Sequence, residues 1–185
     1  MATTGAKFPT LTGSNRESPW SDNAWVNPDG ILSDNANYAS VTATTYDSPD
    51  QTWVLKGGGF GFEVPGDATI LGVECKINCW YANGTVSIDL CQLMDTSAQK
   101  VGTNLCATPE ALGTSTAGIV TKGGASNLWG NALTPAWVNH ANFGIAIGML
   151  STGTDSDVFV DYATLEITYQ VADSASCETF MIFES

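Results

Sequence analysis

Residues 73–93 decide the fold, and they read VECKINCWYANGTVSIDLCQL. Before the pair Asn83-Gly84 the odd-numbered side chains are apolar and most even-numbered ones are polar, which is the period of a β-strand with one buried face. The return limb repeats the pattern, with apolar residues at 86, 88 and 90. Because Asn-Gly accepts positive φ at both central positions of a type I′ turn, the stretch predicts an antiparallel hairpin with one face in a core.

Further short strands are expected on both sides of this stretch. Segments with β-branched or aromatic residues occur at 41–44, 52–56, 116–122, 143–149 and 158–170, and turns with Gly, Pro or Asn separate them. In the last segment the apolar parity changes between Tyr162 and Leu165, which predicts a bulge near Ala163. Residues 134–142 suit at most one helical turn. About eight strands without an amphipathic helix indicate an all-β protein, an antiparallel β-sandwich with a jelly roll as the expected topology.

The composition fits one globular domain and restricts its partners. The chain has 185 residues, of which 43% are hydrophobic and 14% charged. Its 19 acids and six bases give a net charge of −13, which disfavours nucleic acid and anionic membranes as partners. No basic start followed by an apolar run opens the chain, and no window approaches about 18 apolar residues. We therefore expect no secretory signal, no membrane span and synthesis in a cytosol.

Three segments are expected along the chain: an N-terminal arm at 1–19, the β-sandwich domain at 20–170 and a C-terminal tail at 171–185. The arm is polar and rich in turn residues, without periodicity. Free termini usually fray unless something holds them. We expect a neighbouring subunit to order the arm, and the apolar residues 180–183 of the tail either to return to the core or to dock on another chain.

The five cysteines are Cys75, Cys79, Cys91, Cys106 and Cys177. Cys75 and Cys79 share a strand face roughly 13 Å apart, whereas a disulfide requires Cα atoms within about 7 Å. A bridge from Cys91 to either of them is conceivable across the hairpin, but the two bridges require opposed registers. We expect reduced, buried thiols. Zinc is not expected, because no second Cys or His pair accompanies the first.

No catalytic site, cofactor site or metal site is predicted, and we do not expect an enzyme. His140 is the only histidine, and without a nucleophile motif we expect it to be a surface or hydrogen-bonded residue. The glycine runs at 57–59 and 123–124 lack the Lys-Ser/Thr and helix that follow in a phosphate-binding loop. A pair of carboxylates for glycoside hydrolysis stays an open alternative, although the sequence singles out no particular pair.

Calcium is the one metal with candidate ligands, because it binds clustered oxygen atoms. One set is Asp155, Ser156 and Asp157 together with Asp161, and the other is Asp29 with Asp34. The chain lacks the calcium-binding loop pattern of the EF-hand, so solvated loops are the simpler interpretation.

A sugar-binding site is an alternative because six tryptophans could stack on sugar rings: Trp20, Trp25, Trp53, Trp80, Trp129 and Trp137. Tryptophan in a β-sandwich more often fills a core or anchors an interface. Trp80 lies on the polar parity of its strand, so Trp80 and the loop 123–130 are the residues to test for glycan binding.

Short motifs are spread over residues 20–170: WVNP at 25–28, SD at 33–34, YA at 38–39, FGFEVP at 60–65, ATILGV at 68–73, NLWG at 127–130, NFGI at 142–145 and VDY at 160–162. This series resembles a β-sandwich family among the virion proteins of tailed bacteriophages. The family includes head decoration (cement) proteins and proteins associated with tails or fibres. Its motifs are strand patterns and bring no catalytic residues.

The resemblance implies a structural virion protein, made in the host cytoplasm and located in the virion. A capsid decoration or cement protein is the first expectation, stabilising the head by binding the major capsid protein and copies of itself as a homotrimer. The alternative is a receptor- or carbohydrate-binding module of a tail or fibre. A hydrolase of surface polysaccharide would require a carboxylate pair about 5–9.5 Å apart.

Overall fold

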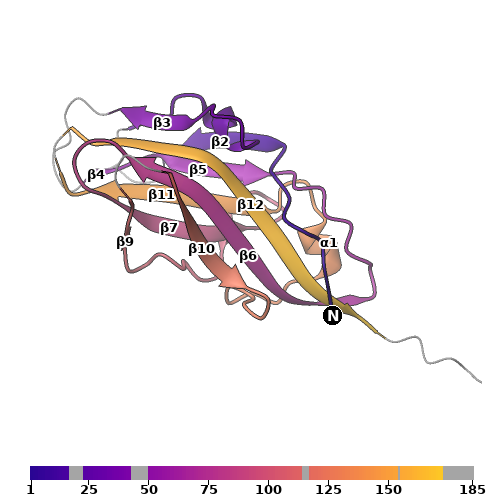
Figure 1. Ribbon diagram of the computed structural model, residues 1–185. Helices are drawn as coiled ribbons and strands as arrows, with labels where there is room; N and C mark the ends of the chain where they lie inside the picture. Colours follow the sequence, from indigo (N-terminus) through magenta and orange to yellow (C-terminus); the bar gives the residue numbers. More distant parts are fainter. Residues whose placement is uncertain (17–22, 43–49, 114–116, 154, 173–185) are drawn as a thin grey trace, which may run out of the picture.

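The computed structural model describes residues 1–16, 23–42, 50–113, 117–153 and 155–172. These residues form two antiparallel β-sheets that pack face to face (Figure 1). The all-β sandwich predicted from the sequence is confirmed, whereas the jelly-roll topology stays a prediction. We call the sheets A and B.

Sheet A is built around its two longest strands, β6 (Ala68–Tyr81) and β12 (Asp157–Val171), which pair along their whole length. β10 (Gly118–Gly124) pairs with the other edge of β6, while β1 (Ala2–Thr3) and β3 (Ala39–Thr42) pair with the other edge of β12. The register shifts between Val160 and Tyr162, leaving Asp161 as an extra residue. The bulge predicted near Ala163 is therefore confirmed, slightly earlier in the strand.

Sheet B contains β2 (Leu11–Asn15), β5 (Val54–Gly58), β11 (Gly144–Ser151), β7 (Val86–Met94) and β8 (Lys100–Val101), in that order. β4 (Asp50–Gln51) also pairs with β11, and β9 (Glu110–Ala111) with β7. The described helices are single turns, a 3-10 helix η1 (Pro28–Ile31) and α1 (Pro135–Val138). The backbone N–H of Trp137 donates to the Thr134 side chain at 3.2 Å, which caps α1 within the segment where a helical turn was expected.

The two central strands exist as predicted, but the prediction that they pair with each other as a hairpin is wrong. β6 belongs to sheet A and β7 to sheet B, so residues 82–85 carry the chain from one sheet to the other (Figure 1). Their apolar faces contribute to one core from opposite sheets, so the two strands do not lie side by side in one sheet. The alternating pattern fixes which face of a strand is buried, not which strand is its neighbour. β6 pairs with β10 and β12, and β7 pairs with β11.

The core lies between the sheets and is filled by their inward side chains. Those without solvent exposure include Val73, Cys75 and Ile77 of β6, Ile88, Cys91 and Leu93 of β7, Ile145 and Ile147 of β11, and Leu165 and Ile167 of β12. Burying one large aliphatic side chain contributes roughly 1.5–3 kcal/mol. These residues therefore dominate the stability of the domain and hold the outward faces in place.

The N-terminal segment belongs to the sheets of its own domain. β1 pairs with the end of β12, Lys7 bridges Leu165, and β2 forms the edge of sheet B beside β5. The ring of Phe8 meets that of Tyr162 edge-on, with centroids 5.7 Å apart. The chain itself thus orders the segment that we expected a neighbouring subunit to hold. In the C-terminal tail, Val171 still belongs to β12, and residues 173–185 lie outside the described residues.

Candidate functional site

Three aromatic rings form a patch on the outer face of sheet A. Trp80 of β6 and Phe159 of β12 are cross-strand neighbours, and their rings stack with centroids 5.3 Å apart. Tyr38, just before β3, meets Trp80 edge-on at 4.7 Å and Phe159 at 6.2 Å. Tyr38 is 37% exposed, and the other two rings are partly buried. We call these three residues the aromatic patch; the outward position of Trp80 predicted from strand parity is confirmed.

Two carboxyl groups lie together on the same sheet, at the bulge of β12. Asp161 accepts a hydrogen bond from Nδ2 of Asn78 at 3.2 Å, and the Asp34 carboxyl group lies against it. Asp34 comes from the loop that a bridge between Leu32 and Tyr162 fixes to β12. Burial raises the pKa of Asp161 above its ordinary value, and the Asp34 charge raises it further, while the Asn78 hydrogen bond opposes the change. We call Asp34 and Asp161 the carboxyl pair.

The structure combines one residue from each predicted set of calcium ligands and separates the others. Asp29 accepts a hydrogen bond from the Thr12 hydroxyl, Asp157 accepts one from Asn83 at 2.7 Å, and Asp155 is exposed. Among the residues that the structure describes, no group of three or more His, Cys, Asp or Glu side chains could hold a metal ion. Of the predicted calcium ligands, the carboxyl pair is therefore what bears on the calcium alternative.

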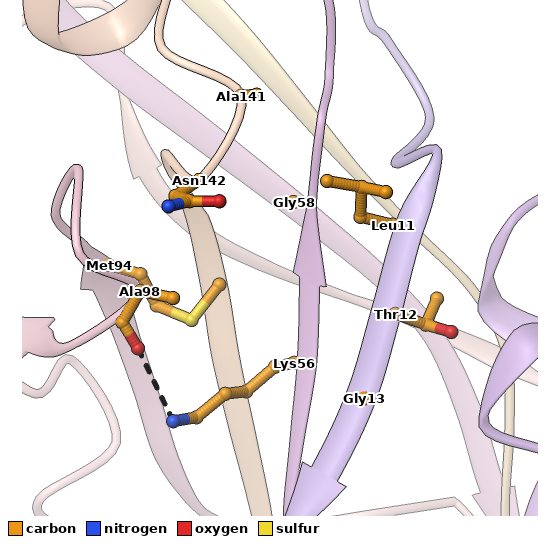
Figure 2. A pocket seen from close by; sticks show the side chains of 9 residues that line it. All are labelled: Leu11, Thr12, Gly13, Lys56, Gly58, Met94, Ala98, Ala141 and Asn142. Atoms are coloured by element: carbon orange, nitrogen blue, oxygen red, sulfur yellow. Dashed lines mark hydrogen bonds between the residues drawn. The ribbon is translucent and has the colours of Figure 1, made fainter.

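A second surface lies on the outer face of sheet B, where a hollow of about 160 Å³ opens between β2, β5 and β7 (Figure 2). Leu11 stands at its rim and is 51% exposed, and the Lys56 ammonium spans the hollow to donate to the Ala98 carbonyl at 3.3 Å. The remaining lining residues are Thr12, Gly13, Gly58, Met94, Ala141 and Asn142. Most of these surfaces are apolar, so the hollow suits an apolar side chain of a partner better than a charged ligand.

Two residues singled out in the sequence do not belong to either surface. Trp129, the aromatic residue of loop 123–130, is completely buried, and its indole N–H donates to the Val73 carbonyl at 2.8 Å. Trp129 therefore stabilises the core and is not accessible to a glycan. His140 is exposed and accepts a hydrogen bond from the Asn142 N–H at 3.1 Å, which confirms the hydrogen-bonded surface histidine.

The four described cysteines, Cys75, Cys79, Cys91 and Cys106, are buried free thiols, as predicted; Cys177 lies outside the described residues. Burial raises the pKa of the Cys79 thiol to about 12. Cys91 and Cys106 are neighbours, because one Asn104 side-chain oxygen accepts both of their backbone N–H groups at 2.9 Å. A hydrogen bond to Cys91 and burial raise the pKa of Cys106, and burial raises that of Cys91. The raised pKa values make Cys79, Cys91 and Cys106 poor nucleophiles, since the thiolate is the reactive form.

The sequence predicts the outward direction of Trp80 and offers Asp34 and Asp161 as calcium ligands in two separate sets. It indicates neither Tyr38 and Phe159 as partners of Trp80 nor the contact between the two acids. Phe159 shares the outward parity of its strand, but only the pairing of β12 with β6 places it opposite Trp80. Tyr38 and Asp34 lie in a loop, where no period indicates a direction. The missing information is in each case a contact between segments distant in the sequence.

Comparisons with models of protein families, with curated proteins and with solved structures found no match. Among the described helices, none has the length and apolar character to cross a membrane. Function must therefore be argued from the aromatic patch, the carboxyl pair and the hollow.

Proposed function

We propose that this protein is a structural virion protein of a tailed phage, a decoration or cement subunit that binds the capsid and further copies of itself. The observation that carries the proposal is the presence of apolar surfaces on both outer faces of one sandwich. The aromatic patch lies on sheet A and the hollow on sheet B. A subunit with two opposite contact faces can hold two neighbours at once, which is what a cement protein has to do.

The size of the surfaces favours many weak contacts over one strong contact. An aromatic side chain buries about 150–250 Å², so three rings supply less than the roughly 800 Å² per partner of a standard stable interface. On a capsid, repeated copies convert weak contacts into strong overall binding through high effective concentration. A homotrimer at local threefold positions would use this effect, and it is the assembly that we propose.

The test is co-sedimentation with empty tailed-phage capsids, combined with the solution mass and the heat resistance of the particles. We expect a trimer that binds capsids and raises the temperature at which they rupture. Trp80→Ala in the aromatic patch and Leu11→Ser at the hollow should each weaken the apparent affinity for capsids at least about tenfold, the effect of losing roughly 1.4 kcal/mol per contact.

Val171→Ser is the matched control, because Val171 is 39% exposed and belongs to neither surface. It should bind like the unmodified protein. A monomer that ignores capsids, or binding that neither variant reduces, contradicts the proposal.

A carbohydrate-binding module is the second candidate, and one observation favours it. The aromatic patch shares a sheet face with Asn78, and the exposed Asp34 carboxyl comes from the same loop as Tyr38, so rings for stacking accompany groups that can bond sugar hydroxyls. Binding to glycans or host cells that Trp80→Ala abolishes, together with no capsid binding, would establish this function instead.

A further inference from the structure

The carboxyl pair contains a buried oxygen atom without a hydrogen-bond donor. Asp161 is 6% exposed; its Oδ2 accepts from Asn78, but Oδ1 is buried and has no partner. The Asp34 carboxyl raises the pKa of this side chain and the backbone N–H of Asn35 lowers it, so both groups lie nearby, although neither donates to Oδ1 with hydrogen-bond geometry. None of these groups carries a positive charge. An unsatisfied buried carboxylate oxygen beside a second carboxyl group is an arrangement that proteins normally compensate with a proton or a cation.

The surrounding backbone defines the position of the Asp161 side chain. Asp161 is the extra residue of the bulge, and bulges redirect a side chain. The bridge from Leu32 to Tyr162 places the loop that carries Asp34 over this point of β12. The two carboxyl groups therefore come from segments far apart in sequence. The sheet holds Asp161, and Asp34 is an exposed loop residue two positions after the bridged Leu32.

We propose that a calcium ion binds between the carboxyl groups of Asp34 and Asp161. Calcium prefers oxygen ligands, accepts irregular geometry and can complete its shell with water, whereas magnesium demands near-ideal octahedral geometry. The described cysteines are buried in the core between the sheets and His140 follows α1, so a metal that prefers sulfur or nitrogen ligands is not favoured. The ion would hold the loop at residues 33–38 against β12 and thereby fix Tyr38 in the aromatic patch. The site does not depend on the proposed function, and its test requires neither capsids nor glycans.

Terbium luminescence provides the direct test, since Tb³⁺ replaces Ca²⁺ and nearby aromatic rings sensitise its emission. Tyr38 lies in the same loop as Asp34, and Trp80 lies on the same strand face as Asn78. We expect sensitised emission from the full-length protein that Ca²⁺ suppresses and Mg²⁺ suppresses far less. Asp34→Asn and Asp161→Asn should lose most of the emission, whereas Asp67→Asn, at an exposed acid outside the pair, should keep it.

Thermal unfolding at matched ionic strength provides a second readout. Relative to chelator, about 5 mM CaCl₂ should raise the Tm of the unmodified protein and of Asp67→Asn by about 2–4 °C, and that of Asp34→Asn or Asp161→Asn by much less. In chelator, Asp34→Asn should be at least as stable as the unmodified protein at neutral pH, because it removes the repulsion within the pair.

Equal Tm shifts in all four proteins would reflect general screening and would overturn the proposal. The proposal would also be overturned if calcium had no effect on the Tm and the free energy of unfolding fell as the pH rose through the titration of the pair. That result would assign a shared proton to the site.

Discussion

Trp80 and Trp129 show how far a single residue can be interpreted before its surroundings are known. Strand parity correctly predicts that Trp80 points away from the core, because β6 is regular around it. Trp129 lies in a loop and has a positive φ of 56°, so no period applies to it. Its indole is nevertheless completely buried, and its N–H satisfies the Val73 carbonyl. Parity decides the direction of a side chain within a strand, and tertiary packing decides it elsewhere.

The buried thiols give a prediction at this scale. With the Cys79 pKa raised to about 12 by burial, only about one molecule in 10⁴ carries its thiolate at pH 8, and the packed core also blocks reagents. We expect the Cys177→Ser variant, which retains only the four buried cysteines, to show no fast reaction with a disulfide reagent when native. All four thiols should react in denaturant.

Denatured protein in the same assay is the control for reagent and protein concentration. Fast reaction of one or more thiols in native Cys177→Ser would show that the core opens readily or that a cysteine is exposed.

The strands themselves were largely predictable, because each one carries its own pattern. Segments 86–93 and 158–170 match β7 and β12 closely, and even the bulge at Asp161 left a signal in the parity of its neighbours. Their pairing was not predictable. The turn chemistry of Asn83-Gly84 indicates a reversal of the chain, which a loop between two sheets satisfies as well as a hairpin does. The N-terminal strands were missed because β1 and β2 are short and polar.

The N-terminal segment yields a prediction at the scale of the element. The Lys7 N–H donates to the Leu165 carbonyl at 2.8 Å, and the Leu165 N–H donates back at 3.1 Å. Lys7→Pro removes the first donor and should lower the free energy of unfolding by about 1–3 kcal/mol, because it leaves a carbonyl of the central strand β12 without its partner. Urea denaturation measures the change.

Lys7→Ala is the matched control, since it keeps the backbone N–H and loses only the exposed contact between the ammonium and the Gly61 carbonyl at 3.2 Å. A surface change of this kind should stay within about 0.5 kcal/mol. If both variants are equally stable, the segment is an appendage and not part of the fold.

For the whole molecule, charge is the property that the sequence alone establishes. The chain carries 19 acids and six bases, and described ion pairs such as Lys76–Glu74 at 2.9 Å are partly exposed and join residues close in sequence. Exposed pairs contribute little to stability, with a median of about 0–1 kcal/mol. Repulsion among the acids should therefore outweigh them, and a charge far from zero disfavours the compact state.

This balance predicts how the protein responds to salt. Raising NaCl from about 0.01 to 0.15 M shortens the Debye length from about 30 to 8 Å, which screens acids that lie across the sandwich from one another more than pairs in contact. Tm should therefore rise by a few degrees at pH 8 in scanning calorimetry, and the rise should shrink close to the isoelectric point, where net repulsion disappears. A Tm that falls with NaCl at pH 8 would mean that local ion pairs stabilise the fold more than the net charge destabilises it. Because sodium binds carboxylate pairs far more weakly than calcium does, this response is also the baseline against which binding at Asp34 and Asp161 has to be measured.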